Sequence, residues 1–296
     1  MAEIDRFVLG AAQLGMRGYG IARDKCHQSD PEEILEKAEA LGIRFVDSAA
    51  IYGKCEQIIG SYLAKHPKSK LGIISKLSPE VDFSNMHAVK DSISASTEKI
   101  GRKLEAFLIH DSKMLQQWNG PLGEGLLRAK QEGLTQDIGV SVYSLSDFDQ
   151  ALSNPYMTYI QAPFNVLDRR LLTSGRLSAA RQAGRKIHLR SIYLQGLLLL
   201  ENIPEKMNFA TPAWKAFRDI CHEFRVTPSA AAIGWAKNNA IDCHLVIGCD
   251  NISQLDSNAN LFFKNNIPMQ CILALNKLPQ ASDAITNPSL WPKQKN

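Results

Sequence analysis

RFVDSAAIYGK, residues 44–54, carries the strongest indication of architecture in this chain: a short apolar run ends at Asp47, and a turn with Tyr52 follows it. Two later runs, LGIISKL (71–77) and LEAFLIH (104–110), have the same form, with apolar residues that lead to a polar residue at the end. Short apolar runs bounded by turns are typical of buried strands. The carboxyl ends of parallel strands lie on one face of a sheet or barrel, so the sequence predicts that these polar residues converge there.

The polar residues at these strand ends are Asp47, Tyr52, Lys76 and His110. A tyrosine phenol titrates near about 10, so it is a poor acid at neutral pH unless a cation stabilises its phenolate. We expect Lys76 to lower the pKa of Tyr52 in this way, and Asp47 to keep the buried ammonium charged. His110 is expected either to hydrogen-bond a substrate oxygen or to share the proton of the tyrosine. Together the residues predict a site that protonates an oxygen while a hydride is delivered, which turns a carbonyl into an alcohol.

The chain shows the regular alternation of strands and helices that a barrel requires. Expected strands begin at residues 6, 44, 71, 105, 136, 159, 186 and 244, and the seventh is expected to span 186–192. Helices are expected between them, among them one at 171–183. Eight strands in a chain of 296 residues favour an α/β fold of the (β/α)8 TIM barrel type, which typically takes about 250 residues, over an open doubly wound sheet. We predict a single domain over 1–296 with an irregular tail at 281–296.

Composition narrows the classes of partner. The net charge is +4 and the basic residues are scattered, so no nucleic-acid-binding face is expected. The N-terminus has no apolar signal region, and the longest apolar run, residues 197–200, is too short to cross a bilayer. The cysteines form no Cys-x-x-Cys pair, so reduced thiols, no metal site and a cytoplasmic location are expected. They are Cys26, Cys55, Cys221, Cys243, Cys249 and Cys271. The oligomeric state is left open.

The strand-end segments resemble a known family. FVDSAAIYGKCEQIIG (45–60), ISK (74–76) and LIHD (108–111) are similar to the signature of the aldo-keto reductases, which is Asp-Thr-Ala-x-x-Tyr-Gly, then a lysine, then a histidine. The resemblance continues through IGVSV (138–142), IQAPFN (160–165) and VIGCDNISQLDSN (246–258), and so covers nearly the whole chain. It implies that Asp47, Tyr52, Lys76 and His110 form the catalytic tetrad of an NAD(P)H-dependent reductase acting on a small carbonyl compound. Segments 9–22 and 189–200 resemble a bacterial branch associated with sugar or polysaccharide metabolism, which suggests a sugar-type carbonyl.

The resemblance also implies where the cofactor binds. No Gly-x-Gly-x-x-Gly fingerprint follows a strand, so a Rossmann-type site is not supported. In the family, the ends of strands five to seven hold the nicotinamide. The matching positions are Ser141 and Gln161 for the carboxamide, Ser191, Leu194 and Gly196 for the pyrophosphate, and Gly248, Gln254 and Asn258 near the adenine and its phosphate. The C-terminal segment of the family can fold over the substrate mouth, which makes Trp291 a candidate lining residue.

Three positions depart from the family pattern. Ser141 is followed by Val142 where the family often has asparagine, so one amide contact is missing. Arg190 stands where an aromatic ring commonly stacks on the nicotinamide. Its planar guanidinium could stack there instead, but its charge would disfavour the oxidised, cationic ring and so favour the reduced cofactor. Asp250 stands where an arginine or lysine often binds the 2′-phosphate, and a carboxylate suits a free 2′-hydroxyl better. The family therefore implies NADP(H), the local chemistry favours NAD(H), and both stay open.

Two other classes of function compete with a reductase. One is a nicotinamide-binding regulatory or sensor subunit without turnover, against which the complete tetrad argues. The other is a Schiff-base barrel lyase that uses Lys76 as its nucleophile. Asp47 argues against the lyase, because a paired lysine stays charged.

Overall fold

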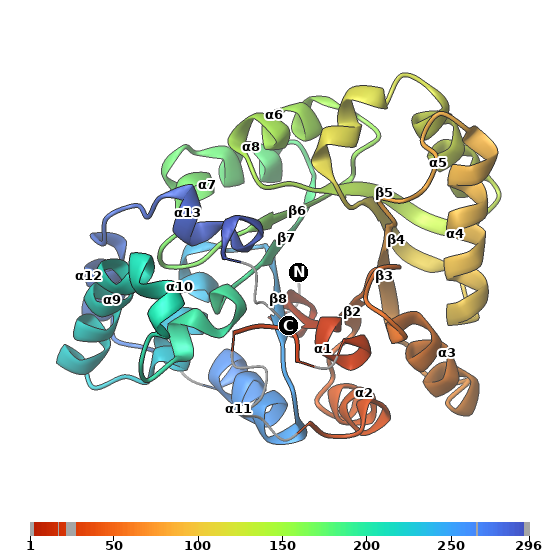
Figure 1. The fold of residues 1–296 in the computed structure, drawn as a ribbon. Helices are drawn as coiled ribbons and strands as arrows, with labels where there is room; N and C mark the ends of the chain where they lie inside the picture. Colours follow the sequence, from red (N-terminus) through yellow and green to blue (C-terminus); the bar gives the residue numbers. More distant parts are fainter. Residues whose placement is uncertain (1–2, 17, 22–27, 265, 293–296) are drawn as a thin grey trace.

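A closed barrel of eight parallel strands forms the centre of the molecule (Figure 1). The computed structural model describes residues 3–16, 18–21, 28–264 and 266–292. The strands follow one another around the barrel in chain order, and β1 closes it against β8. They are β1 Phe7–Gly10, β2 Phe45–Asp47, β3 Gly72–Leu77, β4 Leu104–Ile109, β5 Thr135–Ser141, β6 Tyr159–Pro163, β7 Lys186–Arg190 and β8 His244–Gly248. The (β/α)8 prediction is confirmed.

Helices surround the ring of strands (Figure 1). They are α1 Ala12–Gly15, α2 Pro31–Ala40, α3 Cys55–Lys65, α4 Met86–Ile100, α5 Pro121–Gln131, α6 Leu145–Ser153, α7 Arg170–Thr173, α8 Arg176–Gln182, α9 Thr211–Glu223, α10 Pro228–Asn239, α11 Ile252–Phe263, α12 Met269–Asn276 and α13 Asp283–Thr286. The 3-10 turns are η1 Glu3–Arg6, η2 Ser112–Gln117, η3 Leu194–Leu199, η4 Glu205–Ala210 and η5 Pro288–Leu290. Helix α2 begins as the sequence predicts, because the Asp30 side chain accepts a hydrogen bond from the Glu32 amide and Pro31 occupies the first turn.

Three boundaries differ from the sequence-based expectation, each for a backbone reason. The helix expected at 171–183 is two helices, α7 and α8, separated by Gly175 with φ of +73°. The strand expected to reach residue 192 ends at Arg190, because Ser191 adopts φ of +63°. In the tail, α13 and η5 supply two short helical turns where an irregular segment was expected. Residues 293–296 of that tail lie outside the described residues.

Two histidines stack inside the barrel. His188 on β7 and His244 on β8 are register partners, and their rings lie 4.3 Å apart at an angle of 15°. Both are buried, and neither nitrogen of His188 has a hydrogen-bond partner among the described residues. Burial, and then the charge of His244, hold the pKa of His188 well below its usual range. His188 is therefore a neutral packing residue of the barrel core.

The buried His188 predicts a loss of stability in acid. Below about pH 6.5 the unfolded chain binds a proton at this histidine that the folded chain does not, so the free energy of unfolding falls as pH falls. We expect His188→Phe to reduce this slope by up to about 1.4 kcal/mol per pH unit between pH 6.5 and 5. Urea unfolding at several pH values measures it, with the exposed His222→Phe as control. Equal slopes in wild type and His188→Phe would contradict the assignment.

The structure adds three observations on composition. The described cysteines Cys55, Cys221, Cys243, Cys249 and Cys271 are all buried free thiols, and Cys26 lies outside the described residues. Among the described residues, no group of three histidine, cysteine or acidic side chains is arranged to hold a metal ion. Within the same residues, no helix combines the length and the apolar character needed to span a membrane.

Candidate active site

A buried ion pair lies where β2 and β3 end. Lys76 Nζ donates to Asp47 Oδ2 at 2.7 Å and to the Ser48 carbonyl oxygen at 2.7 Å. The Lys76 residue is 0% exposed and Asp47 is 4% exposed, so solvent screens neither charge. The pairing that the sequence predicted is present. Because the ammonium is bonded on two sides inside the barrel, it is a fixed positive charge below the floor of the site.

Tyr52 stands above this pair, in the turn between β2 and α3. Gly53 has φ of +56°, and a Cβ at Gly53 would lie 2.4 Å from the Gly15 carbonyl oxygen, so the turn is packed backbone to backbone against α1. Lys76 Nζ lies 5.3 Å from the centroid of the Tyr52 ring. Burial, followed by the charge of Asp47, raises the pKa of Tyr52, and the charge of Arg190 opposes the rise. The pKa of Tyr52 is therefore raised overall and the phenol is protonated at neutral pH, while the expected lowering of this pKa by Lys76 stays a prediction.

His110 follows β4 and meets Tyr52 edge to face. The two ring centroids are 6.0 Å apart with an angle of 85° between the planes. Burial, then the charges of Lys76 and Arg190, lower the pKa of His110 to about 3, so the imidazole is neutral near pH 7. Its Nδ1 is buried without a hydrogen-bond partner among the described residues. A neutral imidazole can donate from one nitrogen to an oxygen held beside Tyr52.

A single hydrogen bond ties the second half of the barrel to the ion pair. Gln161 on β6 donates through Nε2 to Asp47 Oδ1 at 2.8 Å. Ser141 on β5 is the register partner of Gln161, and both residues are buried and line the same cavity. Asp47 thus accepts from Lys76 with one carboxylate oxygen and from Gln161 with the other, which satisfies both oxygens.

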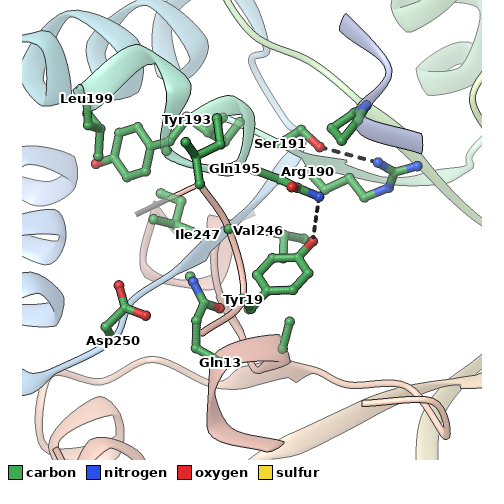
Figure 2. A pocket seen from close by; sticks show the side chains of 18 of the residues that line it. Gln13, Tyr19, Arg190, Ser191, Tyr193, Gln195, Leu199, Val246, Ile247 and Asp250 are labelled. Carbon is green, nitrogen blue, oxygen red and sulfur yellow. Dashed lines mark hydrogen bonds between the residues drawn. The ribbon is translucent and has the colours of Figure 1, made fainter. Parts of the chain in front are cut away.

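These residues open onto a cavity of about 880 Å³ at the carboxyl end of the barrel (Figure 2). Asp47, Tyr52 and His110 line it, while the Lys76 side chain does not reach its surface. Of the residues proposed from sequence for the cofactor, those lining the cavity are Ser141, Gln161, Arg190, Ser191, Gly196, Gly248, Asp250, Gln254 and Asn258. Leu194 does not line it and is fully buried, so its proposed contact is not supported.

The turn after β7 explains why Leu194 is excluded. Ser191, Leu194 and Gln195 all have positive φ, at +63°, +50° and +51°, and Gly196 follows at +90°. This left-handed run places the Gln195 side chain in the cavity, where its Nε2 donates to the Tyr19 hydroxyl at 3.4 Å (Figure 2). Non-glycine residues in this conformation are uncommon and cluster at functional sites.

The opposite end of the cavity is formed by β8 and α11. Gln254 accepts from the Asp250 amide at 2.8 Å and, with Gln28, hydrogen-bonds the Asp250 carboxyl group. Burial raises the pKa of Asp250, and these hydrogen bonds act against the rise. Asn258 accepts from the Tyr193 hydroxyl at 2.6 Å and donates to the Gly248 carbonyl oxygen at 3.4 Å. Asn258 is therefore already engaged within the protein.

Sequence reasoning missed several residues that line the cavity. Gln13 lies on the short helix α1, and a Cβ at Gly248 would come within 2.7 Å of its Oε1. Tyr19 lies between Gly18 and Gly20, both with positive φ, and this glycine pair is the signal that could have marked a loop over the site. Tyr143 packs under Arg190, whose Cζ lies 4.1 Å from the ring centroid.

The C-terminal tail also reaches the site. Arg170 donates to Asp168 and to Asp283 of α13, at 2.8 Å in each case, and so ties the tail to the barrel. Pro288 lines the cavity, whereas Trp291 does not; its Nε1 donates to the Ile285 carbonyl oxygen at 3.0 Å. The expected lining role of Trp291 is not supported.

The parallel barrel, with a buried lysine–aspartate pair beneath a tyrosine and a histidine, defines a class: the (β/α)8 proteins whose site lies at the carboxyl ends of the strands. Residues 6–278 match the model of the aldo/keto reductase family, and the chain belongs to that family.

Several relatives and solved structures are similar to this chain. An aldo-keto reductase from Mycolicibacterium smegmatis is 28% identical over 148 residues, or 47% of this chain, and the match spans about half (49%) of that relative's length. An uncharacterized oxidoreductase from Mycobacterium bovis is 25% identical over 79% of this chain and 77% of its own length. Among solved structures, an aldo-keto reductase from Bacillus halodurans in its holo form has a TM-score of 0.77, with 17% identity over 96% of this chain and 95% of that one. A glycerol dehydrogenase from Gluconobacter oxydans has a TM-score of 0.70, with 18% identity over 98% and 94%. At these identities the structures support the fold alone.

Proposed function

We propose that this protein reduces an aldehyde or ketone to an alcohol with NADH or NADPH, and that Tyr52 is the proton donor. The observation that carries the proposal is the buried Lys76–Asp47 pair, whose Lys76 Nζ lies 5.3 Å from the Tyr52 ring, which in turn meets His110 edge to face. When bound, a reduced nicotinamide supplies the hydride. Tyr52 gives its proton to the oxygen that becomes negative, and His110 donates a hydrogen bond to the same oxygen.

The raised pKa of Tyr52 fits a proton donor. Burial keeps the phenol protonated at neutral pH, so the acid form is the resting form. A phenolate left after transfer lies near the fixed charge of Lys76 and near Arg190, both of which stabilise an anion. The protein's contribution is thus a set of charges held in place before the reaction begins.

The cavity suits a dinucleotide cofactor. It is long enough to separate the Arg190 end from the Asp250 end, which lie apart in Figure 2. Ser141 and Gln161 present a hydroxyl and an amide to the cavity, and Gly196 leaves its backbone open to close approach, whereas the Gln13 side chain packs against Gly248. Ser141, Gln161 and Gly196 are the residues that would hold the carboxamide and the phosphates.

The Asp250 carboxylate favours NADH over NADPH. A carboxylate beside the 2′ position repels a phosphate and accepts a hydrogen bond from a free hydroxyl. We expect tighter binding of NADH, and we expect Asp250→Asn to improve NADPH binding relative to NADH by about tenfold. Fluorescence titration with each nucleotide measures both. An NADPH preference in the wild type that Asp250→Asn leaves unchanged would refute the role of Asp250.

The two competing functions are less well supported. A Schiff-base lyase needs a neutral lysine open to substrate, whereas Lys76 is ion-paired and does not line the cavity. A sensor subunit without turnover needs no proton donor, so the presence of all four tetrad residues argues against this function. Tight nucleotide binding with no reduction of any carbonyl in a broad panel would favour the sensor.

A further inference from the structure

Arg190 is a cation of the cavity that forms no ion pair with any acidic group among the described residues. It ends β7, is half-buried and lines the cavity. None of the ion pairs between described residues includes it, in contrast to Arg170 and Arg176, which pair with aspartates. A buried or half-buried charge without a partner is costly, so its presence in a binding cavity needs a physical reason.

The Arg190 guanidinium is held in place but retains hydrogen-bonding capacity. Nη1 donates to Ser191 Oγ and Nη2 to the Val142 carbonyl oxygen, each at 3.3 Å, and Tyr143 supports the plane from one side. A guanidinium has five N–H donors, so two bonds leave several for a ligand. Its planar fork matches a carboxylate or a phosphate.

The surroundings of Arg190 are neutral or positive. Tyr52 and His110 are uncharged near pH 7, and the charge of Arg190 influences the pKa of each. Lys76 already neutralises Asp47. Asp250 and Glu201 also line the cavity; Asp250 lies away from Arg190 in Figure 2, and Glu201 forms no ion pair with Arg190. Among the described residues, the charge of Arg190 is therefore not neutralised by an ion pair.

We infer that Arg190 binds an anionic group of the substrate, a carboxylate or a phosphate, beside the carbonyl that is reduced. This inference rests on the proposed reductase function and narrows its substrate class to negatively charged aldehydes or ketones. It differs from the stacking role suggested by sequence, in which the guanidinium faces the nicotinamide ring and touches no substrate anion.

The test compares anionic aldehydes with neutral counterparts. Succinic semialdehyde is compared with butanal for the carboxylate, and glyceraldehyde 3-phosphate with glyceraldehyde for the phosphate, in wild type, Arg190→Met and Arg190→Lys. We expect wild type to favour at least one anionic member, and Arg190→Met to lower the anionic-to-neutral ratio of kcat/KM by about 10- to 100-fold. Arg190→Lys keeps the charge but not the fork, so part of the preference remains.

A second cation of the cavity supplies the matched control. Arg218 on α9 also lines the cavity, and its Cζ lies 5.7 Å from the Trp214 ring centroid. We expect Arg218→Met to change the ratio by less than about twofold, since Arg218 lies on α9, outside the ring of strand ends that carries Asp47, Lys76 and Arg190. An equal loss in both variants would mean a general charge effect and would overturn the inference, as would a wild type without any anionic preference.

Binding without turnover separates this inference from the proposed function. If no aldehyde is reduced, the reductase proposal fails. The affinity of Arg190 for an anion can still be measured from the quenching of protein fluorescence by benzoate and by neutral benzamide. Benzoate binding that weakens about tenfold or more in Arg190→Met, with benzamide affected less, supports an anion site. Equal binding of benzoate by wild type and Arg190→Met overturns it. A change confined to nucleotide affinity would support the stacking role and overturn the substrate role.

Discussion

Tyr52→Phe should lower kcat by about 10²- to 10⁴-fold while nucleotide affinity changes by less than about twofold. The substitution removes only the hydroxyl, so the ring still packs edge to face on His110 and the fold is unaffected. Reduction of a panel of aldehydes, followed by loss of nicotinamide absorbance, measures kcat, and fluorescence titration measures nucleotide binding.

The control for this result is the same substitution at Tyr156. That residue is 52% exposed and packs on Trp118, away from the cavity lining. Its change to phenylalanine should leave kcat within about twofold of wild type. A kcat of the Tyr52→Phe variant close to that of the Tyr156→Phe variant would contradict the assignment of Tyr52 as proton donor.

Lys76→Met should affect both stability and turnover. The change leaves the Asp47 carboxylate buried, with only the hydrogen bond from Gln161, and removes the donor to the Ser48 carbonyl oxygen. Breaking a buried ion pair by removing one partner costs about 3–5 kcal/mol, and a methionine side chain cannot stabilise a phenolate. Urea unfolding and the same reductase assay measure the two effects.

The double variant Asp47→Asn with Lys76→Met separates the effects. Neutralising both partners removes the isolated charge, so we expect much of the lost stability to return while turnover stays low. A double variant with restored turnover would show that the lysine charge is not needed for proton donation. A Lys76→Met protein as stable as wild type would contradict the buried pair itself.

Much of the barrel could be predicted because the strand signal is local. All eight expected strands begin within one residue of the observed strands, as β6 at Tyr159–Pro163 and β8 at His244–Gly248 illustrate. The strand expected at 186–192 is two residues too long, because the apolar pattern continues through Ile192. The pattern does not indicate the left-handed backbone conformation of Ser191. Gly175, by contrast, was a visible breaker inside an expected helix.

The candidate site could be predicted only in part. Strand-end positions such as Lys76 were found because the register of a parallel barrel places them on one face. Gln13 on α1 and Tyr19 in the loop that follows were missed because their positions depend on contacts with Gly248 and Gln195, which are far away in sequence. The raised pKa of Tyr52 could not be foreseen either, since burial outweighs the nearby cation only once the turn is packed.

The hydrogen bond from Gln161 to Asp47 joins residues 114 positions apart. It limits which substitutions the protein can accept during evolution. The ion pair and the tyrosine come from the first half of the barrel, whereas the residues proposed to bind a nucleotide come from the second. Substitutions around β8 and α11 can therefore alter the choice of nucleotide without disturbing the charges in β2 and β3. Gln161 is the exception, because its amide contacts Asp47 in the first half of the barrel and lines the cavity from the second half. We therefore expect position 161 to tolerate the fewest substitutions during evolution.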